Sequence, residues 1–226
     1  MSIATVEPNT FGSGGAEPYA QALRRNDAVT LQLSDGRLGE ASTSTMDVSR
    51  WNADADDADL TLLRSVAGPV LDIGCGPGRM VRAALDLGLV VLGVDVSPTA
   101  IEIATEAGLP VLERSVFESL PAEGKWQTAL LVDGNVGIGG DVSAMLSRCI
   151  ALLTPTGEIV VELHDDADRD NAYTARLVDA RGGESAYFPW AEIGLRPMVG
   201  VAAALGLAVV QSWKLDGRTF CRLAAA

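Results

Sequence analysis

The sequence is short of positive charge, cysteine and histidine, and each shortage excludes a class of protein. Thirty Asp and Glu stand against 17 Lys and Arg, and the resulting formal net charge of −13 would repel a phosphate backbone. Three widely spaced cysteines and one histidine offer neither a metal-ligand pattern nor a disulfide framework. No stretch reaches the roughly 20 apolar residues of a bilayer span, and the first ten residues lack the basic and apolar parts of a signal peptide. We therefore expect no nucleic-acid partner, metal or membrane span, and a reducing, cytoplasmic location.

The chain contains enough apolar sequence for one domain. Its 226 residues are 48% hydrophobic and 21% charged, which is typical of a folded protein with a single core. Residues 1–16 are rich in Gly, Ser and Pro and predict a flexible tail, so residues 17–226 form the predicted domain. Apolar spacing predicts a helix over 19–33, followed by a polar loop, and an acid-rich first turn predicts another over 57–66. We interpret residues 17–66 as N-terminal cap helices.

Beyond residue 68, short apolar runs alternate with helical segments. The runs GPVLDIG, LVVLGVD, PVLER, WQTALLVD and GEIVVELH are continuously apolar, which predicts parallel strands covered on both faces. Ser97 and Asp141 are placed to cap two of the intervening helices. The pair Asp216-Gly217 between two strand-like runs predicts a terminal hairpin. These patterns predict an α/β fold: a Rossmann-like doubly wound seven-stranded sheet, mostly parallel with an antiparallel C-terminal strand, with residues 165–193 inserted as a lid.

Two motifs follow the first two predicted strands: LDIGCGPGR at 71–79 and LGVDVS at 92–97. With the terminal hairpin, they make residues 50–224 resemble the class I S-adenosylmethionine-dependent methyltransferases. The stretches DGNVGIGGD and FPWAEIG further resemble bacterial small-molecule methyltransferase-like proteins. The resemblance implies S-adenosylmethionine as cofactor, S-adenosylhomocysteine as product, and a small-molecule acceptor methylated on oxygen or nitrogen by a monomer or homodimer.

The first motif supplies most of the predicted cofactor site. Glycines after a strand let the backbone approach a ligand at the carboxyl edge of the sheet, and an acid ending the second strand suits ribose hydroxyls. By resemblance, Asp72 helps to hold the methionine ammonium group, and Ser115 to Phe117 stand where the family commonly has an acid for adenine. Cys75 is interpreted as a small packing residue of the loop, not a nucleophile. The predicted cofactor-binding residues are Asp72, Gly74, Cys75, Gly76, Gly78, Asp95, Val96, Ser115, Val116, Phe117 and Asp133.

Polar residues at the ends of the fourth and fifth strands are the catalytic candidates. Asp133 and Asn135 are predicted to position the acceptor, and His164 could accept its proton. The glycines of VDGNVGIGGD are predicted to keep the pocket floor low beneath the acceptor. The aromatics Trp51, Tyr187 and Trp190 suit a pocket wall, because the chain is only 5% aromatic, and Arg218 suits an anionic acceptor group.

Other interpretations stay open. Asn135 could be only a turn former and Asp133 a loop acid. His164 and Arg218 could be surface residues, and the aromatics could belong to the core. An NAD(P)-dependent oxidoreductase shares the pattern of strand, glycines, helix and acid, although its third glycine would fall at Arg79. A non-catalytic S-adenosylmethionine-binding protein would share every cofactor residue.

Overall fold

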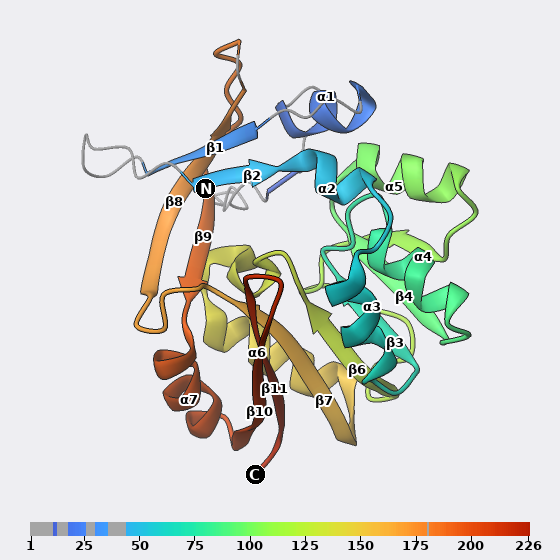
Figure 1. Ribbon diagram of the computed structural model, residues 1–226, viewed down its shortest axis with the longest axis vertical. Helices are drawn as coiled ribbons and strands as arrows, with labels where there is room; N and C mark the ends of the chain where they lie inside the picture. Colours follow the sequence, from blue (N-terminus) through green and yellow to red (C-terminus); the bar gives the residue numbers. More distant parts are fainter. Residues whose placement is uncertain (1–10, 13–17, 26–29, 36–43, 180) are drawn as a thin grey trace, which may run out of the picture.

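A seven-stranded sheet forms the centre of the computed structural model, which describes residues 11–12, 18–25, 30–35, 44–179 and 181–226 (Figure 1). Its strand order is β10-β11-β7-β6-β3-β4-β5, with β3 to β7 parallel and the last two strands antiparallel. The predicted doubly wound sheet and its antiparallel C-terminal strand are therefore confirmed. The strands are β3 (Val70–Ile73), β4 (Val91–Asp95), β5 (Val111–Glu113), β6 (Trp126–Leu131), β7 (Leu153–Leu163), β10 (Leu207–Leu215) and β11 (Arg218–Ala225).

Both faces of this sheet are covered, as the continuous apolar runs predict. On β3, Leu71 packs into a core cluster shared with α6 and α7, whereas its neighbour Val70 packs into one shared with α3, α4 and α5. The predicted caps form as well, since Ser97 Oγ accepts the N–H of Ala100 at 3.3 Å and a carboxylate oxygen of Asp141 accepts that of Ala144 at 2.9 Å. The covering helices are α3 (Asp57–Arg64), α4 (Arg79–Asp86), α5 (Pro98–Glu106), α6 (Val142–Leu152) and α7 (Leu195–Ala204).

A second, antiparallel sheet is built from strands of the predicted cap region, residues 17–66, and of the predicted lid, residues 165–193. Its order is β2-β1-β8-β9, so that blue β1 and β2 lie beside orange β8 and β9 in Figure 1 although they are far apart in the sequence. Residues 165–193 are thus half of a sheet and not a loop alone. The elements are α1 (Pro18–Arg25), β1 (Thr30–Asp35), β2 (Ser44–Asp47), α2 (Val48–Asn52), β8 (Asp170–Val178) and β9 (Phe188–Ile193).

The predicted helix over 19–33 is wrong from Thr30 onward, and its residues 26–29 lie outside the described residues. Thr30–Asp35 form β1, in which Ser34 is paired with Arg176 of β8. The sequence TLQLSD alternates apolar and polar residues with the period of a strand, and a distant partner strand decides the conformation. The polar loop predicted after Leu33 likewise contains β2. Most of the predicted tail, 1–10 and 13–16, lies outside the described residues.

The glycine-rich stretch after β6 joins the two sheets. Asn135–Gly140 form a 3-10 helix, η1, which packs against β9. A Cβ atom at Gly137 would overlap the carbonyl oxygen of Ala191, and one at Gly140 would lie 3.0 Å from Cβ of Pro189. Gly137 and Gly140 therefore serve the close approach of η1 to β9, a packing role that the sequence does not predict.

Within the described part of the chain, no helix combines the length and apolar character needed to cross a membrane. The same residues contain no group of three or more His, Cys, Asp or Glu side chains placed to hold a metal ion.

Candidate functional site: a pocket between the two sheets

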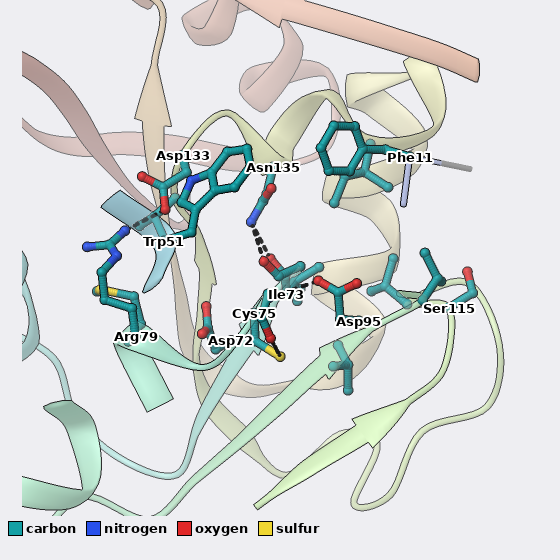
Figure 2. A pocket seen from close by; sticks show the side chains of 18 of the residues that line it. Phe11, Trp51, Asp72, Ile73, Cys75, Arg79, Asp95, Ser115, Asp133 and Asn135 are labelled. Atoms are coloured by element: carbon teal, nitrogen blue, oxygen red, sulfur yellow. Dashed lines mark hydrogen bonds and ion pairs between the residues drawn. The ribbon is translucent and has the colours of Figure 1, made fainter. Parts of the chain in front are cut away.

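A pocket opens at the carboxyl edge of the seven-stranded sheet. The space between its walls, open solvent at the mouth included, is about 830 Å³. Residues following β3, β4, β5 and β6 form one side, and aromatic side chains from the N-terminal segments and β9 form the other (Figure 2). The topology brings these segments together because parallel strands end at the same edge.

The loop after β3 lines the pocket with backbone. Gly74 and Gly76 have φ values of 72° and 54°, a left-handed conformation that residues with a Cβ rarely adopt. Asn135 fixes this loop from above, because its Nδ2 donates to the carbonyl oxygens of Ile73 at 2.8 Å and Gly74 at 2.9 Å (Figure 2). A Cβ atom at Gly74 would lie 2.7 Å from that nitrogen. Asn135 therefore has a specific partner, beyond the role of a turn former.

The third glycine of the motif has a packing role. Gly78 does not line the pocket; it precedes α4 with φ 95°, and a Cβ atom there would overlap the side chain of Leu109. Its predicted contact with a cofactor has no support from this position. Cys75 does line the pocket, and its buried thiol has a pKa raised by burial, as expected of a packing residue.

Asp95 ends β4 with its carboxylate in the pocket lining. One oxygen accepts the N–H of Gly76 at 2.8 Å and the other accepts the N–H of Ser97 at 2.8 Å. Burial raises the pKa of Asp95, and these backbone hydrogen bonds oppose the rise. Because each oxygen can accept a further hydrogen bond, Asp95 is an oriented acceptor for two ligand hydroxyls.

Asp72 is the least satisfied polar group of the lining. Its side chain is 1% exposed, and neither carboxylate oxygen has a hydrogen-bond partner among the described residues. Burial, with smaller contributions from the carboxylates of Asp133 and Asp95, raises the pKa of Asp72 to about 8. A buried carboxylate without a partner is costly. A ligand that carries a positive charge would relieve that cost.

The end of the pocket beyond β5 is lined by Arg114, Ser115, Val116 and Val96. Val116 is buried, and the guanidinium of Arg114 donates to the carbonyl oxygen of Ser119 at 2.9 Å. This end offers backbone groups and apolar surface where the family commonly has an acid.

Four side chains beside the pocket form a closed circuit of alternating charge, here termed the charge ring. Arg79 contacts Asp59 and, at 2.5 Å, Asp133; Arg218 contacts Asp59 at 2.7 Å and Asp133 at 3.4 Å. Glu162 extends the ring, because it pairs with Arg218 at 2.6 Å and accepts the backbone N–H of Asp133 at 2.7 Å. Arg79 and Asp133 line the pocket, whereas Arg218 does not.

The predicted roles of Arg218 change accordingly. Its side chain is only 8% exposed, so it is not a surface charge, and its guanidinium is engaged by Asp59 and Glu162. The predicted role in binding an anionic acceptor has no support from this position. Sequence spacing gives no sign of the ring, which joins α3, α4, β11 and the loop after β6.

Four aromatic side chains, here termed the roof, cover the pocket: Phe11, Tyr19, Trp51 and Trp190. Ring centroids lie 5.0 Å apart for Phe11 and Tyr19, 5.6 Å for Tyr19 and Trp51, and 5.5 Å for Phe11 and Trp190. Burial raises the pKa of Tyr19 well above its ordinary value, so its hydroxyl stays protonated. Trp51 and Trp190 are predicted from the sequence. Phe11 and Tyr19 are not, because a lone aromatic in a Gly-rich stretch or on a short helix carries no distinguishing pattern.

Besides Gly78 and Arg218, three further predicted site residues lie outside the pocket lining. Phe117 is 45% exposed, and Tyr187 is 47% exposed with the guanidinium of Arg176 5.4 Å from its ring centre. His164 is exposed, and its Nδ1 accepts the backbone N–H of Asp166 at 3.1 Å. A role of His164 as general base has no support from this placement.

Known proteins share both this fold and its central motif. Residues 70–157 match a family model described as a methyltransferase domain. The matched segment contains β3, β4, β5 and β6 of the seven-stranded sheet, so this part of the chain is similar to that methyltransferase domain.

The curated relatives that match part of the chain are also methyltransferases. The ubiquinone biosynthesis O-methyltransferase of Rhodopseudomonas palustris (strain TIE-1) is 36% identical over 97 residues, which cover 41% of this chain and 38% of that protein. The trans-aconitate 2-methyltransferase of Paracidovorax citrulli (strain AAC00-1) is 28% identical over 146 residues, 62% of this chain and 52% of the relative. The chain thus spans only about two fifths to one half of these curated relatives.

Solved structures resemble more of the chain. An S-adenosylmethionine-dependent methyltransferase from Bacteroides fragilis, crystallised with S-adenosylhomocysteine, superposes with a TM-score of 0.74 and 20% identity over 92% of both chains. The 1,6-didemethyltoxoflavin-N1-methyltransferase of Burkholderia thailandensis gives a TM-score of 0.58 with 19% identity over 78% of this chain and 81% of its own. At these identities the likeness shows a shared fold.

Proposed function

We propose that this protein binds S-adenosylmethionine in the pocket and transfers its methyl group to an oxygen or nitrogen of a small-molecule acceptor. The observation that carries the proposal is the buried, unpartnered carboxylate of Asp72 beside the oriented carboxylate of Asp95 at the end of a glycine loop. A ligand with a positively charged end and a vicinal diol complements these two groups.

The residues of the pocket fit the cofactor part by part. Asp72 would pair with the methionine ammonium group and Asp95 with the ribose hydroxyls, while Gly74 and Gly76 allow backbone to approach. Ser115 and Val116 would flank the adenine. When bound, the cofactor supplies a methyl group on a positively charged sulfur.

The protein's own contribution to transfer would be orientation and exclusion of water. Asn135 holds the loop beneath the ligand, and the roof covers it. Aligning a nucleophile with its target can account for several kcal/mol of a barrier. Asp133, fixed by the charge ring, is proposed to accept a hydrogen bond from the acceptor and so to position it.

The test is calorimetric titration with S-adenosylhomocysteine and, separately, with NAD⁺, followed by mass spectrometry of small molecules incubated with protein and S-adenosylmethionine. We expect S-adenosylhomocysteine to bind, and an acceptor to gain the mass of one methyl group. Binding of NAD⁺ instead would contradict the proposal and favour an oxidoreductase. Cofactor binding without any methylated product would favour a non-catalytic binding protein.

A further inference from the structure

The charge ring and the roof meet at one side of the pocket. Their side chains indicate the charge and the shape of the acceptor that this side can bind. Figure 2 shows Arg79 joined to Asp133, with Trp51 beside them and Asn135 next along the wall. This side adjoins Asp72, the proposed partner of the methionine end, so the acceptor must approach here. The question is which charge and shape this region accepts.

The cations at this side are already committed. Arg79 is 3% exposed at its side chain, and its guanidinium is held between the carboxylates of Asp59 and Asp133. Arg218 lies behind it and binds Asp59, Asp133 and Glu162. A carboxylate arriving from solution would have to displace an internal carboxylate that the fold already holds in place.

The charge balance points the same way. The cluster of the ring and its neighbours contains four acids against three arginines: Asp56, Asp59, Asp133 and Glu162 against Arg50, Arg79 and Arg218. Arg114, the other arginine of the lining, lies at the opposite end with Ser115 (Figure 2 labels Ser115 there). An anion at the acceptor side would meet net negative charge in a low-dielectric region.

The roof defines the shape. Trp51 and Trp190 come from opposite ends of the chain to line the pocket, and Ile138 of η1 adds an aliphatic contact. Aromatic walls bury large areas of a flat ligand and favour stacked or edge contacts with another ring.

We infer that the acceptor is a flat molecule without negative charge, and that the charge ring is the element that rejects acceptors bearing a carboxylate or phosphate. The inference rests on the proposed function, because it takes the roofed space to be the acceptor's. It names Asp133 as a specificity-determining residue, since this side chain occupies the pocket face of Arg79 that an anion would use.

The experiment compares benzyl alcohol with benzoate, two flat probes that differ in charge, by saturation-transfer NMR with S-adenosylhomocysteine present. We expect the wild-type protein to bind benzyl alcohol at least tenfold more tightly than benzoate. The variant Asp133→Asn puts a neutral amide in place of the carboxylate beside the guanidinium of Arg79, so benzoate should bind more tightly and the ratio of benzoate to benzyl alcohol affinity should rise at least tenfold. A gain of binding cannot be produced by damage to the fold.

The matched control is Glu158→Gln, which breaks an ion pair of 3.0 Å with Arg222. This pair joins β7 and β11, as the pair of Glu162 with Arg218 does, but it lies outside the pocket lining. The variant should leave both probes unchanged. Benzoate bound as tightly as benzyl alcohol by the wild type, no benzoate gain in Asp133→Asn, or no binding of either probe would each overturn the inference. Failure of the proposed function is separate: it appears as no calorimetric binding of S-adenosylhomocysteine, and the probe pair can still be compared with protein alone.

Discussion

The two sides of the pocket are built in opposite ways. At the sheet edge, the groups that face the pocket come from short contiguous segments. Asp72, Gly74 and Gly76 lie close together in the sequence, and Asp95 ends the adjacent strand. The roof takes one side chain at a time from distant segments, as Phe11 and Trp190 show. The comparison teaches that features common to the class lie in local sequence, whereas the acceptor is met by a surface that only the complete fold assembles.

The largest expected effect is a loss of cofactor affinity on changing the sheet-edge side of the pocket. Asp95→Ala removes the acceptor proposed for the ribose hydroxyls and frees the N–H groups of Gly76 and Ser97. We expect affinity for S-adenosylhomocysteine to fall by at least about 100-fold, beyond calorimetric detection. Asp141→Ala is the control, because it removes a helix cap worth about 1 kcal/mol of stability and Asp141 does not line the pocket. Unchanged affinity in Asp95→Ala would remove Asp95 from the site.

The second largest effect concerns stability and tests the contact between η1 and β9, which joins the two sides of the pocket. Gly137→Ala would drive a Cβ atom into the backbone of β9, and we expect the free energy of unfolding to fall by about 3 kcal/mol in urea denaturation. Gly200→Ala, on α7 with open space around it, should instead stabilise the protein by about 0.5–1 kcal/mol. Equal effects of the two substitutions would mean that η1 does not need its close contact with β9.

The same contrast explains how much the sequence could predict. The seven-stranded sheet, its caps and the hairpin at Asp216-Gly217 follow from local patterns, since apolar runs and turn residues act over a few positions. The strand β1 was missed although TLQLSD alternates apolar and polar residues, because so short a pattern does not exclude a helix and the conformation depends on pairing with β8. The charge ring was equally hidden: the sequence predicts that Arg218 lies near the active edge but not that Asp59 and Glu162 engage it.

The third effect tests the unpartnered carboxylate of the sheet edge through pH. Asp72 has an ordinary pKa of 3.8 and a folded-state pKa of about 8, so between these values the folded protein holds a proton that the unfolded chain has released. The free energy of unfolding should therefore fall as pH rises through that window, by up to about 1.4 kcal/mol per pH unit, and become level above it. Denaturation at a series of pH values should show Asp72→Asn lacking this decline.

A cationic ligand reverses that dependence. Because pairing with an ammonium group favours the ionised carboxylate, binding of S-adenosylmethionine should release a proton from Asp72 and tighten as pH rises towards 8. Calorimetry in two buffers of different ionisation enthalpy measures the proton. Wild type and Asp72→Asn with the same proton release would contradict the assignment.

The smallest expected effect, on stability and probe binding, distinguishes the buried rings of the roof from an exposed ring nearby. Tyr187→Leu should change stability by no more than about 0.5 kcal/mol and leave benzyl alcohol binding intact, because that ring is exposed. Trp190→Leu, only three positions along, removes a buried ring of the roof and should weaken the same probe. Equal losses of probe binding would show that the pocket extends to the outer face.

The pairing of β1 with β8 also has a consequence for how the molecule is made. The two strands are separated by more than half the length of the chain, so β1 and β2 leave the ribosome long before their partner exists. Contacts of such high sequence separation form late, whereas β3, β4 and α4 are neighbours along the chain. We expect pulse-labelled hydrogen exchange during refolding to protect β3 and β4 first and β1 last; simultaneous protection would contradict this order. The nascent protein would then pass through a stage in which the cofactor edge is complete and still open to solvent.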